Sequence, residues 1–205
     1  MLTATQIADF HRDGFVKIER AFPRELADEA RAILWRDTGC REDDPRTWTK
    51  PVVRLGMYSQ EPFVKAANTQ MLHGAFNQLI GPGRWLPCRS VGTFPIRFPS
   101  TENPGDAGWH VDPGFGSDNP DFLSWRVNAR SRGRALLMLF LFSDVGEDDA
   151  PTRMRKGSQI EMAKTLTRAG EPGLSLRELA AKPRRPPSLY GSTAAPTPLR
   201  LLPRR

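Results

Sequence analysis

Several features are scarce in this sequence of 205 residues. It has only two cysteines, Cys40 and Cys88, which form neither a CxxC pair nor a disulfide framework. Its longest apolar run, residues 135–142, is far shorter than the roughly 20 residues that span a bilayer. The first residues lack the basic start and apolar stretch of a signal peptide. These absences argue against a disulfide scaffold and predict a cytoplasmic protein with no membrane partner.

Acidic residues are absent from the last part of the chain. Residues 182–205 hold six of the 30 lysines and arginines, six prolines, and no aspartate or glutamate. Without this tail, 24 basic residues face 23 acidic ones, so the body is nearly neutral at +1 and the tail carries the other six of the seven net positive charges. No aromatic–basic motif accompanies the charge, so we expect no nucleic-acid partner. The tail has no strand or helix periodicity, and we expect it to be irregular and poorly packed.

The first eighty residues are predicted to be mainly helical. A capping box at Thr3 and Gln6 starts one helix, and Gly14 ends it. A second helix follows Pro23 and ends at Gly39, and one or two more occupy residues 61–80. Between the first two helices, residues 15–20 alternate between apolar and polar, which predicts a strand.

The second half of the sequence is typical of strands. Extended segments are expected at residues 88–99 and 108–112, and two strands at 122–129 and 134–145 around a turn. The apolar run within the last of these predicts a strand buried on both faces. Short helices are expected after residue 158. This order predicts an α+β domain over residues 1–181, with N-terminal helices packed outside a β-sandwich or barrel, followed by the tail 182–205.

His110 and Asp112 are the candidate metal ligands. In a strand over "GWHVD" they share one face, because successive side chains point to opposite faces. An imidazole and a carboxylate two residues apart can both reach one divalent ion, which is two-thirds of the 2-His-1-carboxylate triad. A surface pair or a hydrogen-bonded couple is the alternative interpretation of so short a pattern.

Three segments in order resemble the phytanoyl-CoA dioxygenase family. They are "FHRDGFVKIERAF", "PIRFPS…GWHVD" and "LLMLFLFSDVGEDDAPTRMRKGSQ", and the similarity covers roughly residues 5–165. The resemblance implies a double-stranded β-helix (a cupin-like jelly roll) and a non-haem Fe(II)- and 2-oxoglutarate-dependent hydroxylase. It implies that His110 and Asp112 bind the iron, that dioxygen and 2-oxoglutarate are co-substrates, and that the substrate is a small organic molecule.

Two arginines are candidates for binding the co-substrate. Arg54 in "PVVRL" and Arg97 in "PIRFP" could each meet a carboxylate or phosphate of 2-oxoglutarate or of the substrate. Members of the family place a basic residue upstream of the metal motif against 2-oxoglutarate. A solvated surface charge is the alternative for each of the two arginines.

The third ligand that the resemblance implies has no counterpart in this sequence. The histidines are His11, His73 and His110, and none follows Asp112. We therefore expect a β-helix core that is incomplete at its C-terminal end. The tail is either a shifted or truncated reading of a gene or a natural remnant. Gln159 and Glu161 are the nearest metal-competent side chains in the later segment and the first substitutes to consider.

Three functions remain open at the level of the sequence. The first is an Fe(II)/2-oxoglutarate dioxygenase, with little turnover in this form because the distal histidine is missing. The second is a non-catalytic jelly-roll protein that binds a ligand or acts as a scaffold. The third is a cupin-like site in which His110, Asp112 and water hold another metal, such as zinc or manganese.

Overall fold

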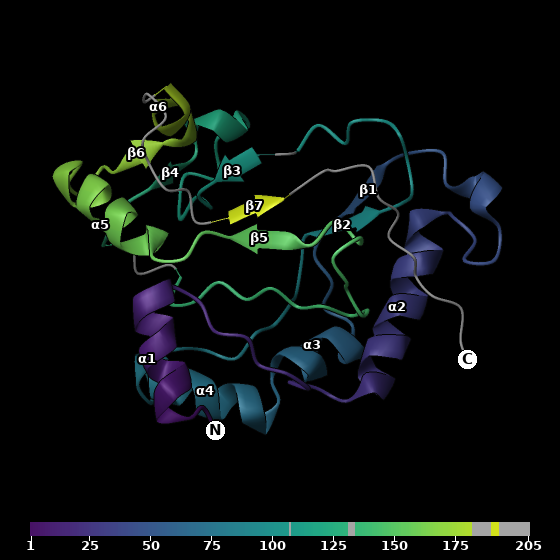
Figure 1. Ribbon diagram of the computed structural model, residues 1–205, viewed down its shortest axis with the longest axis horizontal. Coiled ribbons are helices and arrows are strands. Elements are labelled where there is room, and N and C mark those ends of the chain that lie inside the picture. Colours follow the sequence, from purple (N-terminus) through teal and green to yellow (C-terminus); the bar gives the residue numbers. More distant parts are fainter. Residues whose placement is uncertain (107, 131–133, 182–189, 193–205) are drawn as a thin grey trace.

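The computed structural model describes residues 1–106, 108–130, 134–181 and 190–192. Helices and small antiparallel sheets are mixed, and the described strands form no closed barrel (Figure 1). The helices are α1 Ala4–Asp13, α2 Arg24–Thr38, α3 Glu61–Ala67, α4 Gln70–Ile80, α5 Ser158–Arg168 and α6 Leu176–Ala181. Two short 3₁₀ turns, η1 Pro45–Thr47 and η2 Phe122–Ser124, lie in the connections. The expected mixture of helices and strands is therefore confirmed.

The strands are short and belong to three separate antiparallel sheets. They are β1 Val52–Leu55, β2 Phe94–Arg97, β3 Gly108–His110, β4 Arg126–Val127, β5 Thr152–Met154, β6 Leu174–Ser175 and β7 Tyr190–Ser192. β1 pairs with β2, β4 with β6, and β7 lies between β3 and β5. In Figure 1 the β3–β7–β5 sheet lies in the upper half, above helices α1, α3 and α4.

The N-terminal helices begin and end as the sequence predicts. Thr3 and Gln6 form a reciprocal capping box on α1, and Gly14 ends the helix in the left-handed conformation with φ of 89°. Pro23 precedes α2, and Gly39 ends it with φ of 71°. Residues 61–80 form two helices, because the chain leaves the helical conformation at Asn68 and Thr69 caps the second one. Capping chemistry is local, so these boundaries follow from the sequence.

An aromatic core joins the helical layer to the β1–β2 ribbon. Phe63 of α3 is fully buried, and its ring centroid lies 4.8 Å from Tyr58, 5.5 Å from Phe94 and 5.6 Å from Phe142. The buried Ala30 of α2 packs into the same cluster, which lets the helices approach closely. Rings at these separations and tilts add pairwise attraction to the burial of their surface. The core is thus built from segments more than a hundred residues apart.

Three of the expected strands do not form as predicted. Residues 15–20 follow α1 as irregular chain, and a helical turn, η2, replaces the start of the strand expected at 122–129, which keeps only β4. The segment 134–145 is irregular and only half buried, with Leu137, Leu139 and Leu141 exposed. Alternation and apolarity describe the two faces of a strand, but a strand also needs a hydrogen-bonded neighbour, which residues 15–20 and 134–145 lack in the described part of the chain.

Part of the expected irregular tail is ordered. Residues 190–192 form β7, in register with β3 on one side and β5 on the other. In these three residues the chain has a strand where no periodicity predicted one, because β7 pairs with the edges of both β3 and β5. The rest of the tail, 182–189 and 193–205, lies outside the described residues. Nowhere in the described chain is a helix both long enough and apolar enough to cross a membrane.

Replacement of Phe63 by alanine tests the role of the aromatic core. We expect Phe63→Ala to lower the free energy of unfolding by about 3–5 kcal/mol, because a fully buried ring leaves a cavity among well-packed neighbours. Phe122 is 55% exposed and serves as the matched control, for which Phe122→Ala should cost about 1 kcal/mol or less. Urea denaturation followed by circular dichroism measures both values, and equal losses would contradict this assignment of the core.

Candidate functional site

The candidate metal ligands lie at the end of β3. His110 is the last residue of the strand and is exposed, whereas half-buried Asp112 lies two residues beyond it. The last described pair of β3 with β7 is His110–Tyr190. The chain then turns at Pro113, and the backbone N–H groups of the next two residues bond to the carbonyl oxygen of Arg126 on β4. The prediction that both side chains lie on one strand is therefore wrong for Asp112.

Arg54 and Arg97 are brought together on one face of the β1–β2 ribbon. Arg97 is directly opposite Val52, two residues before Arg54, so the two arginines are diagonal neighbours on the same face. Both bind the carboxylate of Asp106. Arg97 donates two hydrogen bonds, of 3.1 and 2.9 Å, and Arg54 donates one of 2.9 Å. Arg54 also donates to the carbonyl oxygen of Pro104 at 3.2 Å.

The three side chains make a charge cluster with an excess of positive charge. Two guanidinium groups face one carboxylate, and Asp106 lies only four residues before His110 in the chain. The Arg97 side chain is 13% exposed and Arg54 is 55% exposed, so the inner arginine is held more firmly. A carboxylate ligand could join this cluster only by sharing the arginines with Asp106 or displacing it from them.

The described residues do not assemble a complete iron site. They contain no group of three or more His, Cys, Asp or Glu side chains that could hold a metal ion. Glu161, one of the two expected substitutes for the third ligand, forms an exposed ion pair with Lys164 at 2.8 Å. A facial triad needs three protein ligands on one side of the metal, so the residues present do not fit the Fe(II) centre that the resemblance implies.

Gln159, the other expected substitute, caps helix α1 instead. Its side-chain Nε2 donates to the carbonyl oxygens of His11 and Arg12, at 3.1 and 3.2 Å. The backbone N–H of Gly157 donates to the carbonyl oxygen of Asp13 at 2.9 Å. These bonds satisfy carbonyl groups in the last turn of α1 that have no partner within the helix. The turn over residues 156–159 is thus a helix-capping element.

Charges reinforce the contact between α1 and this turn. Lys156 lies 3.4 Å from the Asp13 carboxylate, which is also paired with Arg12 at 2.8 Å. The Arg12 guanidinium, and to a smaller extent Lys156, hold the pKa of the Asp13 carboxyl below its ordinary value. The contribution of this carboxylate to stability is therefore present above the unfolded-state pKa of about 3.9 and lost as the pH falls through the lowered folded-state pKa.

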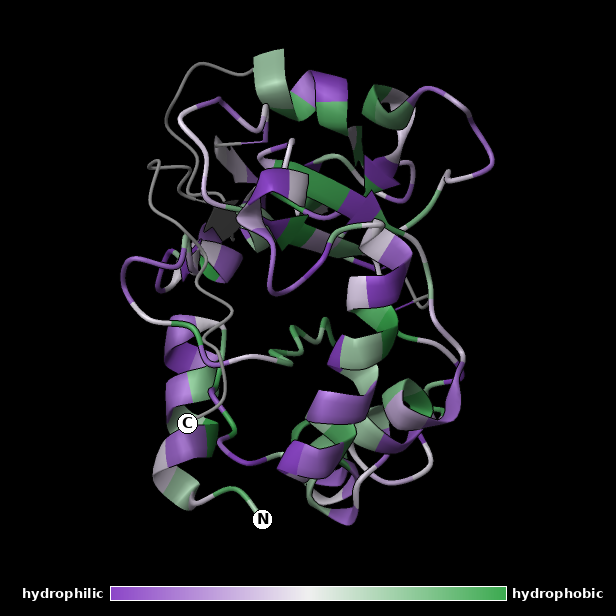
Figure 2. Ribbon diagram, turned by 90° about the vertical axis from the view of Figure 1, so that its right-hand side faces the viewer, coloured by the Kyte–Doolittle hydropathy of each residue, from purple (hydrophilic) through white to green (hydrophobic). Residues whose placement is uncertain are grey.

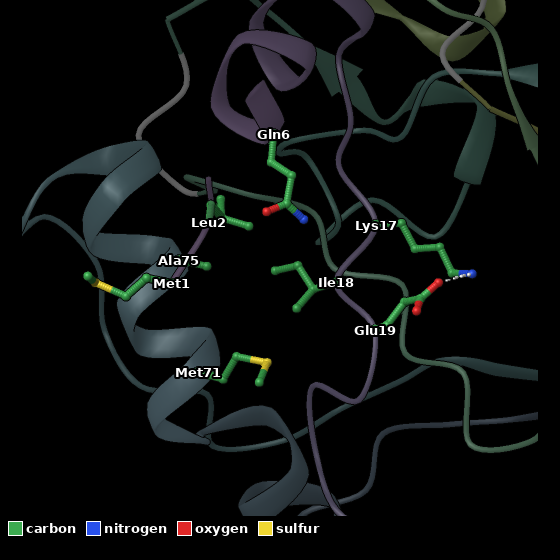
Figure 3. Close-up of a pocket in the computed structure, with 8 residues that line it drawn as sticks. All are labelled: Met1, Leu2, Gln6, Lys17, Ile18, Glu19, Met71 and Ala75. Carbon is green, nitrogen blue, oxygen red and sulfur yellow. Dashed lines mark ion pairs between the residues drawn. The ribbon is translucent and has the colours of Figure 1, made fainter. Parts of the chain in front are cut away.

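A hollow of about 370 Å³ lies elsewhere, where the N-terminal segment and α1 meet α4. Figure 3 shows Gln6, Ile18 and Met71 pointing toward the same space, while Lys17 and Glu19 form an ion pair at its edge. None of the site residues predicted from the sequence lines this hollow. Its lining combines thioether and aliphatic groups with one amide and the Lys17–Glu19 ion pair, whose two charges satisfy each other, so it lacks the convergent charges of one sign that an anion or metal site needs.

Sequence reasoning did not single out Asp106, and it considered Gln159 only as a substitute metal ligand. Asp106 is one of two acidic side chains between β2 and β3, and Gln159 ends the "GSQ" segment where the resemblance implies "GSH", with a histidine that is not a metal ligand. The position of Asp106 close to the metal motif was the only signal for its role. Which arginines it would meet depends on the pairing of β1 with β2, and neither strand is local to it.

The unequal burial of the two arginines predicts unequal effects of their removal. Arg97→Ala should lower the free energy of unfolding by about 1.5–3 kcal/mol, because it removes both hydrogen bonds that Arg97 donates to the Asp106 carboxylate. Arg54→Ala should cost about 1 kcal/mol or less, since an exposed ion pair contributes little. Urea titration measures both. A larger loss for Arg54→Ala would show that the outer ion pair holds the cluster together.

Two glycines with similar backbone angles test the contact between α1 and residues 156–159. Gly14→Ala and Gly39→Ala each place a side chain in the left-handed region, which costs about 1–2 kcal/mol. A Cβ at residue 14 would also collide with the Gln159 amide, whereas a Cβ at residue 39 meets nothing within 4 Å. We expect the greater loss of stability for Gly14→Ala, and part of it should be recovered in Gly14→Ala/Gln159→Ala. Equal losses at both glycines would argue against the contact.

Comparisons of the chain with protein-family models, with curated proteins and with solved structures found no match.

Proposed function

We propose that this chain is related to the Fe(II)- and 2-oxoglutarate-dependent dioxygenases that hydroxylate small organic substrates, and that in this 205-residue form it turns over little or no substrate. The observation that carries the relationship is a contact between two motifs. The "HRDG" segment at residues 11–14 and the "KGSQ" segment at 156–159 belong to the first and third parts of the resemblance, and they bind each other directly.

This contact supports the relationship because it gives both motifs a physical reason to occur together. Gly14 lacks a Cβ where the Gln159 amide lies, and its left-handed backbone ends α1 at the point that residues 157–159 cap. Segments separated by more than 140 residues are thus matched in shape and in hydrogen bonding. A chance resemblance of two short segments gives no reason for their side chains to meet.

The middle part of the resemblance adds a second line of support. Arg54 and Arg97, chosen as candidates for a carboxylate co-substrate, converge on one cluster instead of lying apart on the surface. The cluster is joined to β3 by a short stretch of chain, and β3 ends at His110. We propose that β3, β5 and the extended segment 135–142 correspond to strands of a jelly roll, with His110 and Asp112 at its metal-binding end.

The low turnover follows from counting ligands. His110 and Asp112 are one imidazole and one carboxylate, and no histidine follows them in the sequence. Loss of a group that merely orients a metal ligand typically costs about 10- to 100-fold in affinity or activity, and the loss of a ligand itself costs more. Asp106 also occupies both arginines that would receive 2-oxoglutarate. We therefore infer weak metal binding without efficient oxygen activation.

A non-catalytic binding or scaffold protein is the second candidate function. It is favoured by the lack of any group of three metal-competent acidic, cysteine or histidine side chains among the described residues. A cupin-like site for zinc or manganese, completed by water, is a variant of the first proposal that keeps His110 and Asp112 as ligands. A zinc or manganese site would bind metal, which the non-catalytic protein would not. It would not consume 2-oxoglutarate, which the oxygenase would.

Metal titration and an activity assay test the proposal together. We expect calorimetry under anaerobic conditions to detect weak binding of Fe(II) or Co(II), which His110→Ala and Asp112→Ala each reduce by about tenfold or more. His11→Ala is the matched control, because His11 is an exposed residue of α1. In parallel, oxygen consumption and succinate release from 2-oxoglutarate should stay near the background of metal in buffer.

Two outcomes would contradict the proposal in different ways. Robust succinate release that His110→Ala abolishes would show that the chain completes its metal site with a residue outside the pair, and the inferred low turnover would be wrong. Metal binding that neither His110→Ala nor Asp112→Ala weakens would remove both residues as ligands. The non-catalytic function would then be the better account.

A further inference from the structure

Residues 99–106, in the connection from β2 to β3, are held by the two arginines of the β1–β2 ribbon. In the described chain, four hydrogen bonds from Arg54 and Arg97 reach this loop, three to the Asp106 carboxylate and one to the carbonyl oxygen of Pro104. The connection lies at the upper right of Figure 1, and in Figure 2 the loops of the upper half are coloured mainly purple and white, as hydrophilic chain. The two guanidinium groups therefore fasten a hydrophilic loop to the ribbon.

The Asp106 carboxylate meets these arginines as a carboxylate ligand would. Its Oδ1 and Oδ2 each accept a hydrogen bond from one Nη atom of Arg97, at 3.1 and 2.9 Å, which is the bidentate arrangement of a guanidinium with a carboxylate. Oδ2 also accepts a hydrogen bond of 2.9 Å from Arg54. These contacts use only the two carboxylate oxygens, which every small carboxylate also has. Asp106 thus acts as an internal ligand of a carboxylate-binding site.

Arg97 needs an anionic partner, but that partner can be exchanged. The Arg97 side chain is only 13% exposed, and a guanidinium that is nearly buried is costly without an opposite charge. The side chains of Asp106 and Arg54 are 27% and 55% exposed, so a small ligand reaches the cluster from solvent. Two guanidinium groups against one carboxylate leave an excess of positive charge, which attracts a further anion to the same place. Gly105, directly before Asp106, gives the backbone the freedom to move the carboxylate away.

We propose that Asp106 is a built-in competitor for a small carboxylate ligand of Arg54 and Arg97, and that binding of this ligand releases the loop 99–106. The inference rests on the proposed function for the natural ligand, which is then 2-oxoglutarate, whereas the competition depends only on the three side chains. A group tethered by a short flexible segment has an effective concentration on the order of millimolar, so free carboxylates must reach that range to exchange. Release loosens the chain just before β3, so occupancy of the arginines is coupled to the strand that ends at His110.

Calorimetric titration of the metal-free chain with succinate, at constant ionic strength, measures the competition. We expect Asp106→Asn to lower the Kd for succinate by about tenfold or more, because the amide lacks the charge with which Asp106 competes. Glu102→Gln is the matched control, since it removes the same charge from an exposed residue of the same loop, and it should leave the Kd unchanged. Asp106→Asn/Arg97→Lys should lose the gain, because a lysine makes no bidentate contact. Equal affinities of Asp106→Asn and Glu102→Gln would overturn the proposal.

Limited proteolysis of the unmodified chain tests the release of the loop without any substitution. A glutamate-specific protease can cleave after Glu102 in the loop and after Glu147, which is exposed in another loop and serves as the internal control. We expect saturating succinate, compared with sodium chloride of equal ionic strength, to speed cleavage severalfold after Glu102 and not after Glu147, because cleavage follows the population of the open loop. Unchanged cleavage after Glu102 would refute the release. Both measurements use metal-free protein, so their failure is distinct from a failure of His110 and Asp112 to bind metal.

Discussion

The packing of aromatic rings around Phe63 is the interaction on which the rest of the structure depends. Phe63 touches Tyr58, Phe94 and Phe142, which come from three different parts of the chain. The cluster fixes α3 against the β1–β2 ribbon and holds the end of the segment 135–142. Because that ribbon carries Arg54 and Arg97, the position of the charge cluster depends on the same core.

The contact between α1 and residues 156–159 has a different physical character. It is polar, and it depends on a glycine without a Cβ, two carbonyl groups at a helix end and one side-chain amide. Helix ends leave carbonyl groups without partners within the helix, so a turn that supplies donors at this point has a defined geometry. Gln159, which stands where the resemblance implies a histidine, therefore caps the end of helix α1.

The side chains of the candidate site are held by their surroundings to different degrees. Asp106 joins Arg54 and Arg97 in a cluster whose inner arginine is nearly buried, whereas His110 is exposed at the end of a three-residue strand. Short strands with few neighbours hold their side chains loosely, and a metal site needs ligands fixed within a fraction of an ångström. Among the described residues, β3 ends at His110 and residues 135–142 belong to no ladder. Both features follow from a sheet framework whose described strands are only two to four residues long.

The sequence by itself determined the local features of this protein. The capping box at Thr3 and the glycines that end α1 and α2 are set by neighbouring residues, so they could be predicted, whereas the sequence left open whether residues 61–80 form one helix or two. Only the tertiary structure decided the pairing of strands. The apolar run at residues 135–142 predicted a strand buried on both faces, but Leu137, Leu139 and Leu141 are exposed and the described residues offer the segment no hydrogen-bond partner. No pattern near Asp106 indicated that Arg54 and Arg97 would meet there. Capping acts over three or four residues, whereas strand pairing and ion pairs join residues that are distant in the chain, and their geometry depends on the whole fold.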